Sequence, residues 1–321
     1  MSNAFTASYF QSNEAARAQL EGWRWPNGPV CSHCGVIGRA YATKRAGLYR
    51  CAEPACRKDF TVTTRTVMER SKVPLNKWLM AFFMMASSKN GISAHQLHRS
   101  LGLPYQTAWF MAHRIRHAMS VGGLTATTTP EPMGGEGKIV EADETYFGKT
   151  AEPRPRRKYA DPYTKGGKSG PSNKRPIVSL VERGGHVRSF HVPVATKAAV
   201  MDIVTTNIAK DSRLFTDESR LYGAAKGYFA DHQTVKHSAG EYVRLDDRTI
   251  HSNTIEGYFS IFKRGMKGVY QHCAEKHLHR YLAEFDFRYN HRVGLGFSDV
   301  ERTVAAVRAA EGKRLTYHQT H

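Results

Sequence analysis

The chain has 321 residues and a mass of 36.0 kDa, a length that predicts roughly two domains or three small ones. Its composition, 40% hydrophobic and 23% charged, excludes a disordered or collagen-like protein. The 47 Lys and Arg residues outnumber 28 Asp and Glu, and the resulting net charge of +19 indicates a polyanionic partner, either nucleic acid or an anionic membrane surface.

We expect no membrane-spanning segment, because the longest apolar run covers only residues 79–86 and a spanning helix needs about 20 residues. The first residues show no basic region followed by an apolar stretch, so no secretory signal is predicted. Nucleic acid is therefore the expected partner, and a cytoplasmic, nucleoid-associated location is expected with it.

Residues 1–67 contain a predicted N-terminal helix and two cysteine pairs, Cys31-Ser-His-Cys34 and Cys51-Ala-Glu-Pro-Ala-Cys56. Four thiolates in two short knuckles can close a tetrahedron around Zn²⁺, and a reducing cytoplasm favours metal over disulfides. A zinc ribbon with structural zinc is therefore predicted on Cys31, Cys34, Cys51 and Cys56; the alternative is a set of incidental buried thiols. The remaining cysteine, Cys273, is predicted to be a small packed apolar residue.

Residues 68–120 are predicted to form a helical domain that resembles a helix–turn–helix. Ser93 is a suitable cap for a helix that ends near Leu101, Gly102 supplies the turn, and Pro104 suits the start of a second helix. The second helix of such a motif enters the DNA major groove. We therefore expect Tyr105, Gln106 and Arg114 to face DNA; the alternative is a helical hairpin that binds nothing.

A Gly-, Thr- and Pro-rich stretch at 121–137 is predicted to be a linker. Residues 138–300 then alternate between predicted strands and helices, and 301–321 are predicted to be a C-terminal tail. The strands are expected at 138–146, 176–182, 186–192 and 212–216, and the helices at 196–209, 252–264 and 276–290.

A basic, Gly- and Pro-rich loop at 151–175 interrupts this domain. We expect Arg156, Arg157 and Lys158 in this loop to contact nucleic acid, with a solvated charged loop as the alternative.

Three acidic residues are candidates for a catalytic centre. Asp143 and Asp217 lie at predicted strand ends, and Glu256 opens a predicted helix. Three carboxylates in one pocket repel each other unless divalent cations neutralise them. Two Mg²⁺ or Mn²⁺ ions held in this way would suit phosphodiester chemistry. The alternative is that these are scattered surface acids.

The order of the motifs resembles that of bacterial insertion-sequence transposases of the DDE class, in the branch with an N-terminal zinc ribbon and an ISXO2-like catalytic domain. The residues that carry the resemblance are the cysteine pairs, Ala142-Asp-Glu-Thr-Tyr-Phe-Gly148, Thr216-Asp-Glu218, His251-Ser-Asn-Thr-Ile-Glu-Gly257 and Lys263-Arg-Gly265. The resemblance implies an α/β fold (α+β over the whole chain) with an RNase H-like catalytic domain. In that domain Asp143 and Asp217 match the two metal-binding aspartates and Glu256 matches the third ligand.

Some relatives have Asn at the third position, so Asn253, one helical turn before Glu256, is an alternative magnesium ligand. Lys263 matches the family's DNA-contacting lysine, and Arg264 follows it. Glu144 is expected to point away from the pocket, because neighbouring residues of a strand face opposite sides. Glu141 shares the face of Asp143 and is a minor alternative ligand.

These features together predict a DDE transposase that binds double-stranded DNA at the terminal inverted repeats of its element. It would hydrolyse the element ends and join the freed 3′-hydroxyl to target DNA, as a homo-oligomer because two ends react together. The alternatives are a DNA-binding regulator with a degenerate C-terminal half, and an RNase H-like nuclease that cuts without joining.

Overall fold

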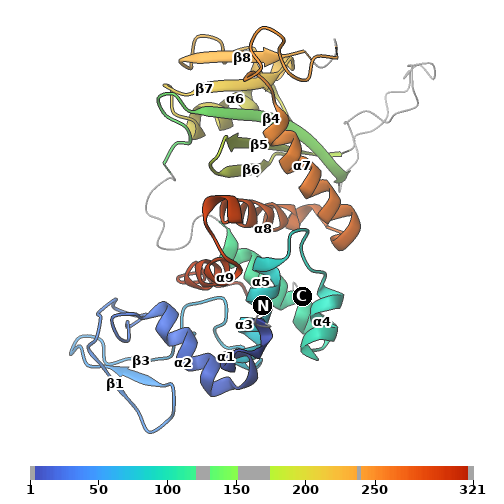
Figure 1. Cartoon of the computed structure of the whole chain (residues 1–321). Coiled ribbons are helices and arrows are strands. Elements are labelled where there is room, and N and C mark those ends of the chain that lie inside the picture. Colours follow the sequence, from blue (N-terminus) through green and yellow to red (C-terminus); the bar gives the residue numbers. More distant parts are fainter. Residues whose placement is uncertain (1–3, 121–130, 151–173, 237–239, 317–321) are drawn as a thin grey trace. The chain divides into compact units, whose positions relative to one another are not determined.

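The computed structural model describes residues 4–120, 131–150, 174–236 and 240–316. The chain forms two compact units, one of Met1–Thr127 with His291–His321 and the other of Thr128–Asn290 (Figure 1). The second unit therefore ends ten residues before the predicted boundary at 300. The predicted DNA-contacting residues Arg156, Arg157 and Lys158 lie outside the described residues.

The cysteine-containing segment is a small antiparallel sheet in the order β1 (Ala40–Ala42), β2 (Tyr49–Cys51) and β3 (Asp59–Phe60). Its apolar support is a cluster of three rings, in which Trp25 and Tyr49 each contact Phe60. Strands this short bury little apolar surface by themselves, so the sheet needs a further source of stability.

The helices of the first unit surround α3 (Leu75–Ser87), which contains the apolar run of the sequence. Trp78, Leu79 and Phe82 of α3 are fully buried. This helix packs against the elements α1 (Ser8–Gln11), α2 (Asn13–Arg24), α4 (Ala94–Leu101), α5 (Tyr105–Met119) and α9 (Asp299–Arg308). The apolar run thus forms the core of a cluster of helices.

The predicted turn between α4 and α5 is present. Ser93 caps α4 by accepting a hydrogen bond from the backbone N–H of Gln96 (3.1 Å). Gly102 has φ +58°, the left-handed conformation that ends a helix, and Pro104 directly precedes α5. The two helices pack against each other, as a helix–turn–helix requires.

The prediction of a C-terminal tail from residue 301 is wrong for the described residues. Ser298 and Glu301 form a reciprocal capping box that starts α9, and Ala306 and Val307 of this helix are buried. Further on, the Lys313 ammonium donates hydrogen bonds to backbone carbonyls at the end of α5. The segment after 298 is therefore an integral part of the first unit.

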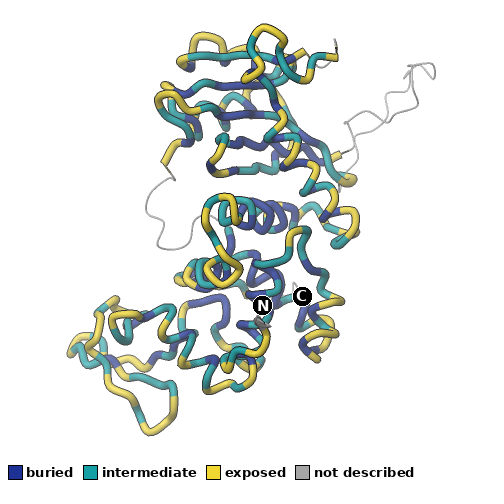
Figure 2. Tube along the Cα trace, viewed as in Figure 1, coloured by how far each residue is buried: buried dark blue, intermediate teal, exposed yellow. Residues whose placement is uncertain are grey.

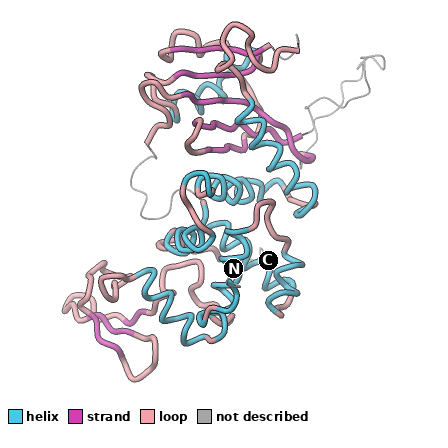
Figure 3. The backbone as a smooth tube through the Cα atoms, in the orientation of Figure 1, coloured by secondary structure: helices cyan, strands magenta, loops and turns pink. Residues whose placement is uncertain are grey.

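The second unit is built on a five-stranded sheet in the order β6–β5–β4–β7–β8. Figure 3 shows its strands in magenta, with helices in cyan next to them. The strands are β4 (Ile139–Lys149), β5 (Lys174–Glu182), β6 (Val187–His191), β7 (Arg213–Asp217) and β8 (Asp231–Val235). β4 pairs antiparallel with β5 and parallel with β7, which in turn pairs parallel with β8. Only β8 was not predicted, because its sequence Asp-His-Gln-Thr-Val lacks a clear apolar pattern.

Helices cover both faces of this sheet. α6 (Lys197–Asn207) packs on the face formed by Val140 and Ala142 of β4. α7 (Asn253–Gly265) and α8 (Leu278–Asn290) pack on the opposite face, against Ile177 and Val181 of β5. The buried residues of the sheet lie mainly in β4, β5 and β7 (Figure 2), and the predicted mixture of helices and sheet is confirmed.

The predicted linker at 121–137 is packed structure in its described part. Met133 is buried, and its backbone pairs with Asn207 and Ala209 after α6 (2.7 and 2.9 Å). Among the described residues, no helix combines the length and the apolar character that crossing a bilayer requires.

A buried carboxylate, Asp286 of α8, joins three elements of the second unit. It accepts hydrogen bonds from the Tyr258 hydroxyl of α7 (2.5 Å) and from the hydroxyl and backbone N–H of Ser189 in β6 (both 2.8 Å). Burial raises the pKa of Asp286 to about 6, although these hydrogen bonds oppose the shift.

This shift predicts a pH-dependent stability. Because the folded pKa lies above the unfolded value, Asp286 contributes most below about pH 4, and its contribution is lost as the pH rises through 6. Asp286→Asn should therefore flatten the dependence of the unfolding free energy on pH by up to about 3 kcal/mol between pH 4 and 7. Urea unfolding of both proteins across this range tests it; parallel curves would contradict it.

Candidate functional site

The four cysteines of the N-terminal sheet converge on one point. Their sulfur atoms lie within 4.8 Å of one another, with 3.8 Å between Cys31 and Cys56 and 3.6 Å between Cys34 and Cys51. A tetrahedron with Zn–S bonds of about 2.3 Å has edges of about 3.8 Å. The four cysteines therefore fit structural zinc, as predicted.

Electrostatics also favour a cation at this point. Burial, followed by hydrogen bonding with the neighbouring thiols, raises the pKa of Cys51 to about 12. Without a cation the Cys51 thiol would thus remain protonated, whereas bound Zn²⁺ deprotonates its thiol ligands.

The acidic centre follows from the pairing of β4 with β7. Ala142 is in register with Thr216, so the next residues of the two parallel strands, Asp143 and Asp217, lie side by side. Each of them offers a carboxylate oxygen to a group whose atoms all lie within 4.8 Å of one another. Burial and the charges of Asp217, Glu144 and Glu256 raise the pKa of Asp143 well above its usual value.

The third member of this close group is Glu144, contrary to the prediction that it points away. Its carboxylate accepts hydrogen bonds from Ser219 (3.2 Å) and Tyr222 (3.1 Å), beyond the end of β7. Because successive side chains of β4 point to opposite faces, Glu144 does lie on the α6 side of the sheet. However, the pairing of β4 with β7 ends before Glu144, which is in register with Val178 of β5 on its other side. With the β7 side open, this long side chain reaches the centre.

Glu256 of α7 lines the same cleft as Asp143 and Glu144, and it accepts a hydrogen bond from the Ser252 hydroxyl (3.2 Å). It is not part of the group within 4.8 Å. The alternative ligand, Asn253, is exposed at the start of α7 and is not among the residues that line this cleft. The geometry therefore favours Glu256 over Asn253.

The structure excludes Glu141 as a ligand. Its side chain is fully buried, and its carboxylate caps the N-terminus of α7 by accepting from the Thr254 hydroxyl (2.8 Å) and the Ile255 N–H (2.9 Å). It also pairs with Arg183 (2.6 Å). Arg183 in turn donates to the backbone carbonyl of His251 (2.7 Å), so this network fixes the start of α7 against β4.

The basic end of the cleft continues the same helical stripe. Ser260, Lys263, Arg264 and Lys267 line it together with the acidic residues. Positions 256, 260, 263 and 267 follow the spacing that aligns side chains along one helix face. Sequence analysis named Lys263 and Arg264 but missed Lys267, which the same spacing indicates.

The predicted DNA-facing residues of α5 divide into two groups. Tyr105 and Gln106 are exposed at its N-terminal end. Arg114 is buried: it donates to the Glu69 carbonyl (2.8 Å) and lies over the rings of Trp78 and Phe110. The prediction for Arg114 is therefore wrong, because α3 covers the face of α5 that it occupies.

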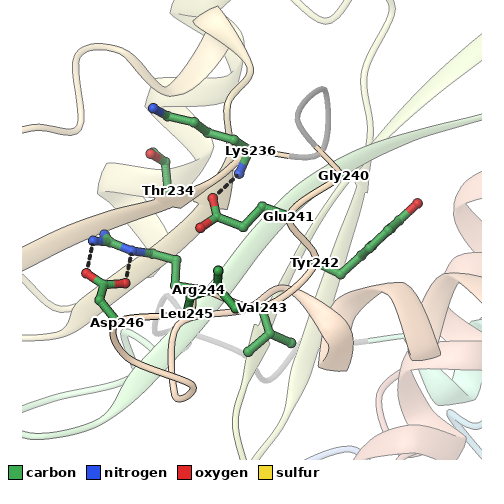
Figure 4. Close-up of a pocket in the computed structure, with 9 residues that line it drawn as sticks. All are labelled: Thr234, Lys236, Gly240, Glu241, Tyr242, Val243, Arg244, Leu245 and Asp246. Atoms are coloured by element: carbon green, nitrogen blue, oxygen red, sulfur yellow. Dashed lines mark hydrogen bonds and ion pairs between the residues drawn. The ribbon is translucent and has the colours of Figure 1, made fainter.

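A second hollow of this unit lies next to β8 and is lined by Thr234, Lys236 and residues 240–246 (Figure 4). The Glu241 carboxylate accepts from the backbone N–H of Lys236 (3.2 Å), and Arg244 forms an ion pair with Asp246. Its acidic groups are thus already engaged by neighbours, which makes it a poor candidate for a metal centre.

The cap formed by Glu141 predicts a large effect on stability. Glu141→Gln would leave the partly buried Arg183 without its counter-charge, which should lower the free energy of unfolding by about 3 kcal/mol. The exposed Glu218 offers a matched control: Glu218→Gln should change the free energy of unfolding by less than about 0.5 kcal/mol. Urea unfolding measures both; equal values would contradict the capping role.

The zinc site predicts the metal content. Freshly purified protein should contain about one zinc per chain, and Cys51→Ser should retain less than about half of it, since one of four ligands is lost. Cys273, which lies outside the cluster, provides the matched control Cys273→Ser with unchanged zinc. Elemental analysis decides between these outcomes, and equal zinc in both variants would reject the site.

Comparison with known proteins identifies both parts of the chain in which these sites lie. Residues 134–290 match the family model of the ISXO2-like transposase domain, and residues 11–59 match that of the transposase zinc-ribbon domain. A protein in transposable element ISH50 of Halobacterium salinarum is 28% identical over 288 residues, which cover 87% of this chain and 91% of that protein. The chain therefore belongs to the insertion-sequence transposases that combine a transposase zinc ribbon with an ISXO2-like transposase domain.

Proposed function

We propose that this transposase cuts and joins DNA with two divalent cations held by Asp143, Asp217 and Glu256. The observation that carries the proposal is the parallel register of β4 and β7, which sets two partly buried aspartates side by side in a cleft that Glu256 also lines. Such like charges are stable together only when cations neutralise them. Oxygen ligands of this kind suit Mg²⁺ or Mn²⁺.

When bound, two such ions would activate the attacking water or 3′-hydroxyl and stabilise the leaving oxygen. The residues of the chain supply the surroundings. Glu144, held by Ser219 and Tyr222, adds a further carboxylate oxygen to the centre. The capping network of Glu141 keeps α7 in place, so that Glu256 stays over the centre.

The basic end of the cleft would hold the DNA strand. Lys263 lies two helical turns from Glu256, a spacing of about 10 Å along the axis, and Lys267 lies one further turn away. Phosphates of a strand recur every few ångströms, so these ammonium groups can pair with phosphates that flank the reacting one. Arg264 would contribute a further cation.

The first unit would bind the terminal inverted repeats of the element. Its support is the zinc ribbon together with the exposed Tyr105 and Gln106 at the start of α5, the part of a helix–turn–helix that reaches base edges. Because two element ends are cut and joined together, the active form would be a homo-oligomer on DNA.

The test is metal-dependent cleavage and strand transfer on a duplex that carries an element end. Asp143→Asn, Asp217→Asn and Glu256→Gln should each lower both rates by more than about 100-fold while binding stays near wild type, since they remove ligands and not DNA contacts. Asn253→Ala should retain activity, and Glu218→Gln serves as the matched control. Full activity of Glu256→Gln with loss in Asn253→Ala would instead reassign the third ligand.

Two outcomes would favour other functions. Binding without cleavage in Mg²⁺ and Mn²⁺ would indicate a regulator. Cleavage without joining of pre-cut ends would indicate a nuclease of the same fold.

A further inference from the structure

A cavity of the first unit has a charge that the catalytic proposal does not use. It lies between α2, the loop that joins β1 to β2, and the segment leading into α3, with a volume of about 520 Å³. Three basic residues from these sequence-distant segments line it: Arg17, Arg45 and Lys72. No Asp or Glu is among its lining residues.

None of these three cations forms an ion pair within the described part of the chain. Glu21, one turn beyond Arg17 on α2, instead accepts a hydrogen bond from the Tyr49 hydroxyl (3.0 Å). Three cations that line one cavity without ion-pair partners make it a site where an anionic ligand would be electrostatically favoured.

The backbone is shaped to admit one of these cations. Gly47, in the β1–β2 loop, has φ +78°, and a Cβ atom placed on it would lie 2.5 Å from Cδ and 3.3 Å from Nη1 of Arg17. The left-handed backbone at this position favours glycine, and the absence of a Cβ atom lets the Arg17 side chain lie against the loop as it does here. The Arg17 side chain thus lies beside the loop that carries Arg45.

The floor of the cavity is apolar. Met68 and Trp78, both almost fully buried, contribute to it together with Leu75. The hydroxyl of Ser71 is already engaged, since it accepts from the Trp78 indole (3.0 Å). Recognition of an anion would thus fall to the guanidinium and ammonium groups, while Leu75, the partly exposed residue of this floor, can contact a carbon skeleton.

We propose that this cavity binds the sugar–phosphate backbone of duplex DNA, with Arg17, Arg45 and Lys72 pairing with phosphates and the apolar floor facing deoxyribose. The inference rests on the proposed function, in which the first unit holds the element ends. Contacts of this kind position the duplex without reading its sequence. The cavity is also larger than a lone inorganic phosphate needs, which favours a nucleotide chain over a free anion.

The experiment measures the affinity of the full chain for two duplexes, one with the element's terminal sequence and one of random sequence, as a function of NaCl concentration. Each lost phosphate contact reduces the slope of log K against log salt by about 0.9. Arg17→Gln and Lys72→Gln should each show this reduction with both duplexes. In the triple variant, which combines them with Arg45→Gln, the slope should be smaller by about 2.7. Lys89→Gln, an exposed lysine outside the cavity, should keep the wild-type slope.

Zinc content and urea unfolding of each variant establish that the first unit is intact. Slopes of intact variants equal to that of Lys89→Gln would overturn the inference. It would also be overturned if inorganic phosphate bound wild type and not the triple variant, while both kept the same DNA slope, because the cavity would then be an anion site unrelated to DNA.

The two proposals fail separately. A wild-type protein that binds and cleaves DNA, with cavity variants that behave like it, contradicts only the cavity. An Asp143→Asn protein should keep the full salt slope, because its carboxylate contacts no phosphate directly. A wild-type chain that binds neither duplex contradicts both proposals.

Discussion

The mutual repulsion of Asp143 and Asp217 is the constraint on which the second unit depends. Parallel pairing of β4 with β7 forces their carboxylates together at a point where burial already disfavours charge. A fold that keeps such an arrangement must be stable enough elsewhere to hold it. Here the two helical layers over the sheet supply that stability, and the centre remains poised to take up cations.

Glu141, two residues before Asp143, is a buried carboxylate whose charge the protein itself neutralises. Glu141 lies on the same strand face as Asp143, but it is matched by Arg183 and by the N-terminus of α7. One carboxylate is thus satisfied by the protein and the next is left for a ligand. This difference in partners, together with the access of Asp143 to the cleft, separates a structural acid from a candidate metal ligand.

Much of the fold and the main candidate ligands could be predicted from local sequence. The cysteine knuckles, the turn at Gly102 and the strand-end aspartates each carry their own signal. The failures have a common cause, since Glu144 depends on where the neighbouring strand stops and Arg114 on which helix covers it. Neither fact is local. The failure to predict α9 is different, because the Ser298–Glu301 capping box is a local sequence signal for a helix start and could have been recognised.

Residues 291–316 follow the second unit in sequence but belong to the first unit. The second unit is inserted in the sequence of the first unit, so the chain passes between the two units twice, near residues 127 and 290. Cleavage of either crossing by a protease would leave both units attached through the other, as long as the first unit remains folded. A shortened chain that lacks α9 would therefore lose part of the packed framework of the first unit and not a dispensable extension.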